Sequence, residues 1–243
     1  GDKAFCAGGD IVSVYHSKSL NNGLSEVFFK EEYILNIAIK NFKKPWISIL
    51  DGVSMGGGLG LAMHGSHRIV TEKTIAAMPE TAIGLFPDVG GGHFLSRMNG
   101  SLGLFIALTG YLLKTEDCMY TGLGTHYIKK DNIFKFLEQL LFLDSQSELN
   151  DINVVLNKYT EENRKAPLLE IESDINQNFN FDSIDQILES LKNTNTNWSN
   201  NILDILEHKS PTSLAITTKQ LSLAKDMNFK DCMIMEYRMS QEC

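Results

Sequence analysis

The alternation of apolar runs and polar turns along the first half of the chain predicts short strands connected by helices. Three short apolar runs are predicted to be strands, and a proline stands just before the first of them: residues 47–50, 67–70 and 74–78. Four stretches have the spacing or the small-residue content of helices: residues 59–63, 91–98, 102–110 and 115–121. Strand, glycine turn, helix and strand in this order indicate an α/β domain.

A longer helix is predicted over residues 27–43, and it ends where two lysines and a proline follow. At about 100° per residue, Phe28, Leu35 and Ile39 fall on one face of this helix. Glu32 lies in the middle of that face. The helix is apolar on most sides, so the spacing leaves two alternatives open. Glu32 either faces a functional site, or it lies at the boundary of the buried face and reaches solvent.

The character of the sequence changes after residue 133, where helical periods dominate, glycine becomes scarce and asparagine becomes common. Residues 193–201 (NTNTNWSNN) are predicted to form a polar loop of low complexity. Another helix is predicted to follow, with Ser210 as its N-cap and Pro211 at its first position.

Both ends of the chain are expected to be incomplete. The first residue is glycine, and the sequence opens on what is predicted to be the end of a strand. We expect residues 1–120 to form an α/β core that lacks its N-terminal part, and residues 121–243 to form a truncated, mainly helical region. A targeting peptide cannot be judged from such a piece. Uncovered apolar surface would make the piece prone to aggregation.

Composition and charge narrow the classes of function. The chain has 243 residues, of which 43% are apolar, so a large buried core can form. The net charge of −8 and the lack of a basic run argue against a nucleic-acid surface. No apolar run is long enough to predict a membrane-spanning helix. The four cysteines lack CxxC spacing, which favours free thiols in a reducing compartment.

Three glycine-rich turns are the first candidates for chemistry: residues 7–10 (AGGD), 55–58 (MGGG) and 87–92 (PDVGGG). A glycine loop that opens a helix offers backbone N–H groups to negative charge, but one such loop is equally a tight connection. None of the three has the GxGxxG or Walker spacing, which disfavours nucleotide binding. Gly9 and Gly57 could each supply one N–H to a single oxygen, which is the arrangement of an oxyanion hole.

Two carboxylates stand in a stretch that carries no other charge. Glu80 follows Pro79 at the end of a predicted strand, and Asp88 follows Pro87. An acid in such surroundings tends to have a raised pKa, which suits acid/base catalysis near neutral pH. The alternative is that both are ordinary turn residues.

Two other chemistries find less support. His64 and His67 have a spacing that could suggest a metal, but no third ligand stands at a telling distance, and packed or surface histidines are the simpler interpretation. The sequence has no GxSxG elbow, so a Ser-His-Asp hydrolase is not supported.

The glycine turns and their flanks resemble the crotonase (enoyl-CoA hydratase/isomerase) superfamily. Three segments carry the resemblance: residues 3–10 (KAFCAGGD), 51–58 (DGVSMGGG) and 78–92 (MPETAIGLFPDVGGG). The third segment is similar to the 3-hydroxyisobutyryl-CoA hydrolase branch of that superfamily. Three further segments are similar to the same branch: residues 28–33 (FFKEEY), 210–213 (SPTS) and 236–238 (EYR).

The resemblance implies a fold and a set of roles. The fold would be a crotonase-like ββα spiral core followed by a mainly helical region. The amides of Gly9 and Gly57 would form the oxyanion hole. Glu80 would be the catalytic glutamate and Asp88 the second catalytic carboxylate. Glu32 and Gly57 would contact the substrate, as would both acids.

The same resemblance implies an activity and its setting. The reaction would be hydrolysis of the thioester of 3-hydroxyisobutyryl-CoA in valine catabolism. The partner would be an acyl-CoA small molecule, with CoA as part of the substrate and neither metal nor redox cofactor. The family's placement implies mitochondria, with peroxisomes in some lineages, and assembly into a homo-oligomer stays open.

Two departures from the hydratases of the superfamily decide between activities. Hydratases carry a second catalytic glutamate where this chain has Gly60, and a glycine where it has Asp88. Both departures oppose hydration of a double bond. Two alternatives remain, namely an enoyl-CoA hydratase or isomerase on the same fold, and a non-catalytic subunit that binds CoA esters.

Overall fold

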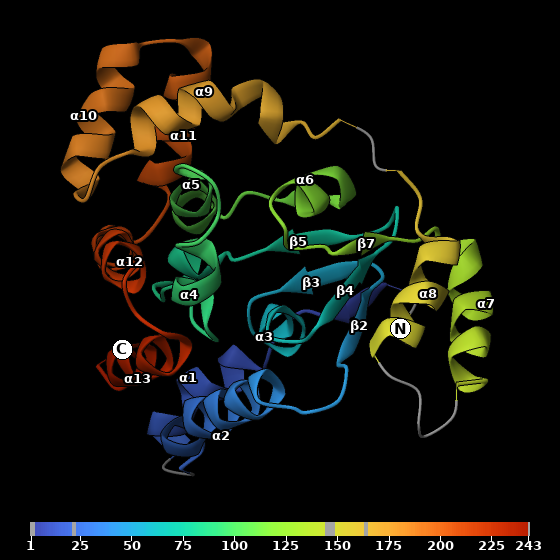
Figure 1. The fold of residues 1–243 in the computed structure, drawn as a ribbon. Coiled ribbons are helices and arrows are strands. Elements are labelled where there is room, and N and C mark those ends of the chain that lie inside the picture. Colours follow the sequence, from blue (N-terminus) through green and yellow to red (C-terminus); the bar gives the residue numbers. More distant parts are fainter. Residues whose placement is uncertain (1–2, 21–22, 144–148, 163–164, 243) are drawn as a thin grey trace.

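The computed structural model describes residues 3–20, 23–143, 149–162 and 165–242, and it combines two small sheets with many helices (Figure 1). The first sheet has the order β1-β3-β5-β6. Its strands β1 (Ala4–Cys6), β3 (Val53–Met55) and β5 (Ile75–Ala77) are parallel, and β6 (Leu113–Lys114) runs antiparallel to β5.

The second sheet has the order β2-β4-β7 and is parallel throughout. Its strands are β2 (Ile47–Leu50), β4 (His67–Val70) and β7 (His126–Tyr127). The strands predicted at residues 47–50 and 67–70 are therefore confirmed, and the strand predicted at residues 74–78 is shorter by one residue at each end.

Short helices follow the strands in the first half of the chain. They are α1 (Ile11–Leu20), α2 (Leu24–Lys40), α3 (Gly57–Met63), α4 (Gly91–Leu95), α5 (Leu102–Thr109) and α6 (Thr115–Tyr120), with one 3₁₀ turn at Glu80–Ile83. The helices predicted from the sequence in this half all exist, with ends that differ by a few residues.

The second half of the chain adds only helices after β7. They are α7 (Lys130–Leu141), α8 (Leu149–Tyr159), α9 (Leu168–Phe179), α10 (Ile184–Thr194), α11 (Asn197–Glu207), α12 (Pro211–Ala224) and α13 (Phe229–Ser240). Ser210 caps α12 as predicted, because its hydroxyl accepts a hydrogen bond from the Ser213 N–H. The division of the chain at residue 120 stays a prediction.

The predicted polar loop at residues 193–201 is wrong for most of its length. α11 begins at Asn197, directly after a capping box in which Thr196 and Ser199 each accept a hydrogen bond from the other's backbone N–H. Ile202 and Leu206 bury the apolar side of the helix. Polar residues that cap a helix and polar residues that avoid structure look alike in composition, so the pattern hid a junction between two helices.

The buried face of α2 also differs from the prediction. Leu35 is 45% exposed, whereas Phe29, Tyr33, Asn36 and Ile39 are buried. The face is rotated because Tyr33 and Asn36 point into the protein despite their polar groups. A scheme that counts only apolar residues cannot find such a face.

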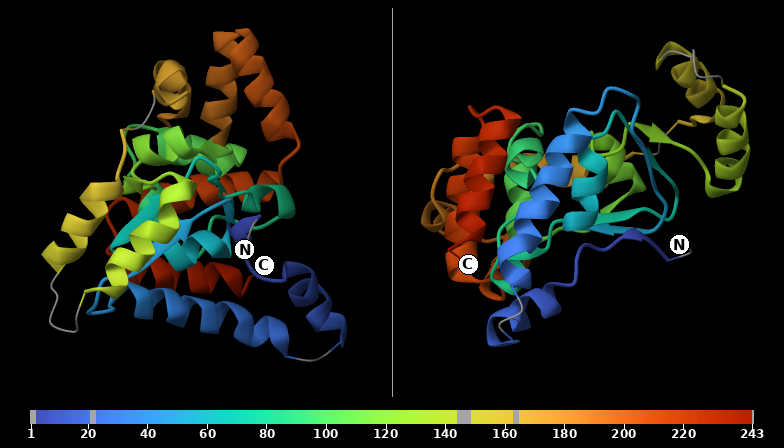
Figure 2. Two further views of the ribbon diagram at one scale, coloured as in Figure 1. Left: turned by 90° about the vertical axis from the view of Figure 1, so that its right-hand side faces the viewer. Right: turned by 90° about the horizontal axis from the view of Figure 1, so that it is seen from below.

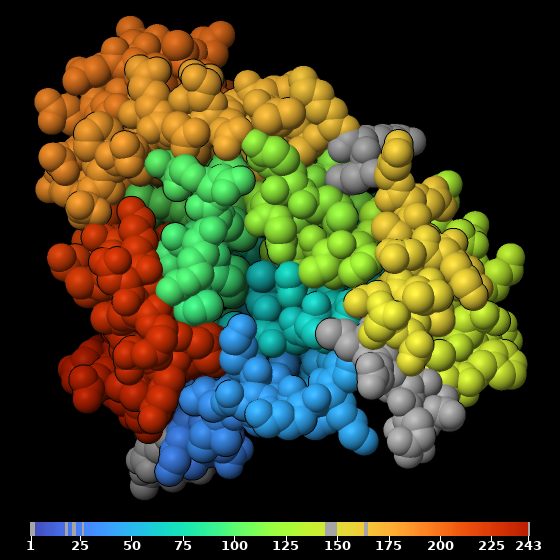
Figure 3. Space-filling model, in the orientation of Figure 1, coloured from blue at the N-terminus to red at the C-terminus, as the bar shows by residue number. Residues whose placement is uncertain are grey.

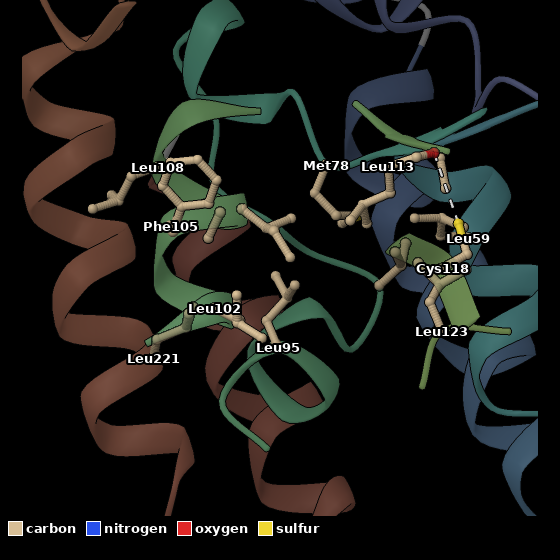
Figure 4. Close-up of a cluster of buried hydrophobic side chains, with 14 of the residues drawn as sticks. Leu59, Met78, Leu95, Leu102, Phe105, Leu108, Leu113, Cys118, Leu123 and Leu221 are labelled. Atoms are coloured by element: carbon tan, nitrogen blue, oxygen red, sulfur yellow. Dashed lines mark hydrogen bonds between the residues drawn. The ribbon is translucent and has the colours of Figure 1, made fainter. Parts of the chain in front are cut away.

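The main core lies between the first sheet and the helices α3, α5 and α12. Figure 4 shows Met78, beyond β5, with Leu59 of α3 on one side of it and side chains of α5 and α12 on the other. A second, smaller core joins α7 and α8 to the β2-β4-β7 sheet through Ile69, Phe136 and Leu156. α13 packs against α2 and α4, so the last helix lies beside the first elements of the chain (Figure 2).

The state of the cysteines and the question of membrane-spanning helices were also addressed from the sequence. Cys6, Cys118 and Cys232 are free thiols, as predicted, and Cys243 lies outside the described residues. Over the described ranges, no helix combines the length and apolar character needed to cross a bilayer.

Candidate active site

Three neighbouring strands end at one edge of the first sheet. β1, β3 and β5 are adjacent and parallel, with Cys6 opposite Ser54 and Met55 opposite Ala77. The segments that follow these strands must therefore emerge side by side. In parallel sheets, ligands commonly bind beyond the carboxyl ends of the strands. The first two glycine turns and the Pro79-Glu80 segment all emerge at this edge.

The first two glycine turns touch each other. A Cβ atom placed on Gly8 would lie 3.4 Å from the Gly57 nitrogen, and one placed on Gly57 would lie 3.5 Å from the Gly8 Cα. Gly57 is the first residue of α3, so its N–H has no acceptor within that helix. The backbone around Gly9 and Gly57 thus meets at one place, as an oxyanion hole would require.

Side chains from other elements leave no room beside these turns. A Cβ on Gly57 would lie 2.4 Å from the Glu32 Oε1, and a Cβ on Gly9 would lie 2.4 Å from the Phe28 ring. A Cβ on Gly56, whose φ is 51°, would likewise lie 2.8 Å from the Glu80 Oε1. The glycines are needed because two carboxylates and an aromatic ring occupy the space of their missing side chains.

One pocket of about 150 Å³ collects all the predicted site residues. Its lining includes Gly9, Glu32, Gly57, Glu80 and Asp88. Apolar side chains complete the wall, namely Phe28, Met55, Ile83 and Leu85 among others. The structure therefore brings together every residue that the sequence singled out, and the role of each stays a prediction.

Burial changes the protonation of the three acids. Glu80 and Asp88 are each only 5% exposed. Burial, helped by the charge of Asp88, raises the pKa of Glu80 well above its ordinary value. Burial also raises the pKa of Asp88 to about 6 and, together with the Asp88 charge, the pKa of Glu32 to about 7. Near neutral pH the pocket therefore holds both protonated and ionised carboxyl groups, which suits acid/base work.

One oxygen of Glu80 is left without a protein contact. Its Oε2 is buried and has no hydrogen-bond partner among the described residues. A buried acceptor of this kind is uncommon, because most buried polar atoms are paired. The oxygen therefore keeps free acceptor capacity in a residue that lines the pocket.

Tyr33 completes the surroundings of Asp88, and sequence reasoning gave it no role. The Tyr33 hydroxyl donates a hydrogen bond to the Asp88 Oδ2 at 3.0 Å, and this bond acts against the rise in the pKa of Asp88. Tyr33 stands next to Glu32 in the sequence and on the buried face of α2. Only the correct orientation of that face would have revealed it.

The backbone beside Asp88 is strained. Val89 has φ 49°, a left-handed conformation that a β-branched residue rarely adopts and that costs about 1–3 kcal/mol. The Val89 carbonyl accepts a hydrogen bond from the His64 ring at 2.6 Å. Strain of this kind persists only where the surroundings hold it, and it often marks a functional loop.

The metal alternative for His64 and His67 finds no support in their contacts. His64 contacts the Val89 carbonyl, and His67 contacts the hydroxyl of Ser66 and the side chain of Asn153. Both rings are buried, as packed histidines are. Within the described part of the chain, no group of three or more His, Cys, Asp or Glu side chains is arranged to hold a metal ion.

Gly60 leads to the first testable prediction. A Cβ at this position would lie 2.7 Å from the Val89 Cβ and 2.9 Å from the Asn36 Nδ2, so the glutamate that hydratases carry here has no space. Gly60→Ala is expected to displace Val89, to lower the free energy of unfolding by about 1–3 kcal/mol despite alanine's helix preference, and to reduce turnover. Thermal unfolding and steady-state kinetics measure both effects. A variant as stable and active as the parent would mean that the backbone around Val89 can move away from the added methyl group at no measurable cost.

Comparison with known proteins identifies the family. Residues 1–243 match the family model described as enoyl-CoA hydratase/isomerase. The chain belongs to the enoyl-CoA hydratase/isomerase family. The resemblance to the crotonase superfamily and the α/β fold class inferred from it are thereby confirmed.

Relatives of known sequence and structure agree with this assignment. Over its whole length, the chain is 43% identical to a Xenopus laevis protein and 42% identical to a Homo sapiens protein, both named 3-hydroxyisobutyryl-CoA hydrolase, mitochondrial. The chain spans 64% of the length of each of these curated relatives.

Two solved structures of the family resemble the chain closely. A carnitinyl-CoA dehydratase from Mycobacterium thermoresistibile superposes with a TM-score of 0.91 at 34% identity, over 99% of this chain and 69% of that one. An enoyl-CoA hydratase from Rhodobacter sphaeroides 2.4.1 gives a TM-score of 0.88 at 30% identity, over 100% of this chain and 69% of that one.

Proposed function

We propose that this protein hydrolyses the thioester of 3-hydroxyisobutyryl-CoA, or of closely related 3-hydroxyacyl-CoA esters, to the free acid and CoA. The names of the curated relatives support the substrate. The observation that carries the proposal is that Glu80, Asp88 and the glycine turns of Gly9 and Gly57 line one pocket.

The reaction begins with the thioester carbonyl oxygen between the amides of Gly9 and Gly57. These two donors stabilise the negative charge that develops on this oxygen, and each such donor is typically worth about 2.7–4 kcal/mol. Between their two pKa values the acids hold one proton together, and the reaction proceeds from the form in which Asp88 carries this proton and Glu80 is ionised. A carboxylate oxygen of Glu80 attacks the carbonyl carbon, the C–S bond breaks, and an acyl–Glu80 anhydride forms. The departing CoA sulfur takes the proton of Asp88.

The second half of the reaction regenerates the site. A water molecule gives a proton to the ionised Asp88 and attacks the anhydride, which releases the acid and restores the Glu80 carboxylate. In the alternative route, Glu80 removes a proton from water, and this water attacks the thioester directly. The unpaired Oε2 of Glu80 is compatible with either route.

The remaining parts of the proposal concern recognition and setting. Glu32, whose Oε1 lies beside the Gly57 turn, would orient the 3-hydroxyl group of the acyl chain. The chemistry requires neither a metal nor a redox cofactor, because the acids and amides supply each proton transfer and the charge stabilisation. The names of the relatives support a mitochondrial location, and neither relative is named peroxisomal. A role in valine catabolism is consistent with the substrate in these names.

A panel of acyl-CoA esters tests the proposal. Purified protein expressed from the whole gene is incubated with 3-hydroxyisobutyryl-CoA, 3-hydroxypropionyl-CoA and isobutyryl-CoA, and free thiol is measured. We expect thiol release from the first two esters. Crotonyl-CoA serves as the test for hydratase activity, followed by loss of its enoyl absorbance. Fast hydration of crotonyl-CoA without thiol release from any ester would overturn the proposal.

The protonation of the pocket gives a second prediction. Below about pH 6, the pKa of Asp88, both buried acids hold a proton and Glu80 cannot attack. Above the raised pKa of Glu80 both acids are ionised, and no proton is available for the leaving sulfur. Because the two acids interact, each apparent pKa in the pH profile describes the titration of the pair and not of one residue. We expect a bell-shaped profile of kcat/KM for thiol release, measured from about pH 4 to about pH 10.

The pH at which activity is lost on the acidic side of this profile distinguishes a buried pair of acids from exposed carboxyl groups. A limb near about pH 4.5 would be that of an exposed glutamate, and it would contradict the buried pair. A profile without an alkaline fall would contradict the proton-donating role of Asp88.

A further inference from the structure

Glu236 lies on α13, far from the pocket acids in sequence, and nothing in the proposed reaction uses it. It belongs to the EYR segment that the sequence singled out without a role. α13 packs against α2 and α4, and Figure 3 shows its surface beside that of α2. The Glu236 side chain is fully buried, which is rare for a glutamate without a strong reason.

The reason is a set of hydrogen bonds to the segment of residues 87–92, which we call the acid loop because it carries Asp88. The Glu236 Oε2 accepts from the Gly90 N–H at 2.7 Å, and its Oε1 accepts from the Gly92 N–H at 2.9 Å. Two backbone donors two residues apart thus converge on one carboxyl group, an arrangement similar to an anion-binding nest. Here the carboxyl group is supplied by another part of the same chain.

Gln220 of α12 extends this set of bonds. Its Nε2 donates to the Pro87 carbonyl at 2.7 Å and to the Glu236 Oε1 at 3.2 Å. The acid loop is therefore held on both sides of Asp88, at Pro87 before it and at Gly90 and Gly92 after it. The strained Val89 lies between these attachment points.

The next residue of α13 reaches the other partner of Asp88. The Tyr237 ring packs edge-to-face on the Tyr33 ring, with 6.3 Å between centroids. Tyr33 in turn donates its hydroxyl hydrogen bond to Asp88. Two consecutive side chains of α13 thus contact the backbone that carries Asp88 and the tyrosine that contacts its carboxylate.

Glu236 lies outside the pocket, so it can act on the reaction only through the residues that line the pocket. Glu236 is not part of the pocket lining, so it does not touch the space for the substrate. It fixes instead the backbone from which Asp88 projects. Reacting groups must be placed closely, since a displacement of about 1 Å can cost about a hundredfold in rate.

We propose that Glu236 is a positioning residue for Asp88, which it holds in the pocket by binding the Gly90 and Gly92 amides of the acid loop. This inference rests on the proposed function in one respect, namely that Asp88 takes part in the reaction. The binding of the loop by Glu236 is a separate statement and can be tested without a substrate.

Glu236→Gln is the direct test, because glutamine has the same shape but only one acceptor oxygen for the two loop amides. In protein expressed from the whole gene, we expect kcat for thiol release to fall about ten- to a hundredfold, with KM changed less than about threefold. Glu242→Gln, an exposed glutamate just beyond the same helix, is the matched control and is expected to behave like the parent.

A readout on Asp88 itself distinguishes positioning from general support of the fold. Burial raises the pKa of Asp88 to about 6. The titratable groups around Asp88 are Tyr33, Glu32, Glu80 and Glu236. In Glu236→Gln the hold on the loop is reduced and Asp88 becomes less strictly buried, so the pKa of Asp88, followed by carboxyl NMR titration, is expected to fall towards its ordinary value.

Three outcomes would overturn the inference. An unchanged kcat and Asp88 titration in Glu236→Gln would show that the loop needs no such hold. A parallel loss of kcat and substrate binding with an unchanged Asp88 titration would indicate a general structural role. If the variant does not fold, amide exchange in the parent decides: Gly90 and Gly92 amides that exchange as fast as that of the exposed Gly100 overturn the inference, and slow exchange supports it.

The same measurements separate this inference from the proposed function. If the parent released thiol from no acyl-CoA ester, the proposed function would fail. The Asp88 titration and the exchange of the Gly90 and Gly92 amides would still decide whether Glu236 holds the acid loop.

Discussion

Replacement of Glu80 by glutamine is expected to slow thiol release from 3-hydroxyisobutyryl-CoA by about 10³- to 10⁵-fold. Glutamine fills the same volume beside Gly56 but cannot attack a thioester or remove a proton from water. The fold should persist, and the variant should become more stable than the parent as the pH rises above 4.5, because the unfolded parent releases the Glu80 proton there while burial retains it in the folded parent. Steady-state thiol assays and thermal unfolding measure the two effects.

The control for this variant is Glu207→Gln, at the exposed end of α11, which is expected to leave activity and stability unchanged. Undiminished thiol release by Glu80→Gln would favour a different nucleophile. If neither the parent nor the variant released thiol but both bound acyl-CoA, the non-catalytic CoA-ester-binding subunit would become the better interpretation.

A single turnover in ¹⁸O-labelled water separates the two routes proposed for Glu80. In the anhydride route, water can attack the Glu80 carbonyl of the anhydride, which leaves label in the Glu80 side chain. In the direct route, or after water attack on the acyl carbonyl of the anhydride, all label enters the product acid. Label in the peptide that contains Glu80, detected by mass spectrometry, would therefore demonstrate nucleophilic catalysis.

The sequence could point to residues that line one pocket because much of this pocket is built from local turns on neighbouring strands. Each of the first two turns follows a short strand directly, and Glu80 lies just beyond the third strand. Parallel pairing of these strands then brings the turns together without further information. The resemblance to a family supplied the roles, which spacing alone left open for Glu32, Glu80 and Asp88.

Sequence reasoning missed what depends on packing between distant elements. Tyr33 meets Asp88 only because α2 turns a polar residue towards the protein interior. Glu236 meets the acid loop only because α13 returns to the first half of the fold. A periodic pattern shows which side of a helix is apolar, but it does not show which buried polar group will find which partner.

Asp88→Asn is expected to inactivate the protein and to stabilise it at the same time. The loss of the proton donor and acceptor should lower thiol release by about 10²- to 10⁴-fold. The stability effect has the opposite sign, because the folded protein raises the pKa of Asp88 from 3.8 to about 6. Asparagine can still accept the Tyr33 hydrogen bond, so the packing around position 88 should be kept.

The pH at which the two proteins differ in stability follows from these values. Below pH 3.8, Asp88 is protonated in both the folded and the unfolded chain, and the substitution should change little. Between that pH and about 6, the unfolded chain releases the proton while the folded chain retains it, so folding of the parent becomes less favourable. Above about 6, the variant should be more stable by an approximately constant 1–3 kcal/mol.

Urea unfolding at several pH values measures this difference, with the exposed Asp204→Asn as the control that should show none. A gap that stayed at zero above pH 6 would mean that Asp88 ionises as freely as in water, and it would contradict its burial in the pocket. A gap of the expected sign together with lost activity would show that the protein gives up stability to hold a second carboxyl group opposite Glu80. Such a trade is expected where buried acids are kept for chemistry rather than for packing.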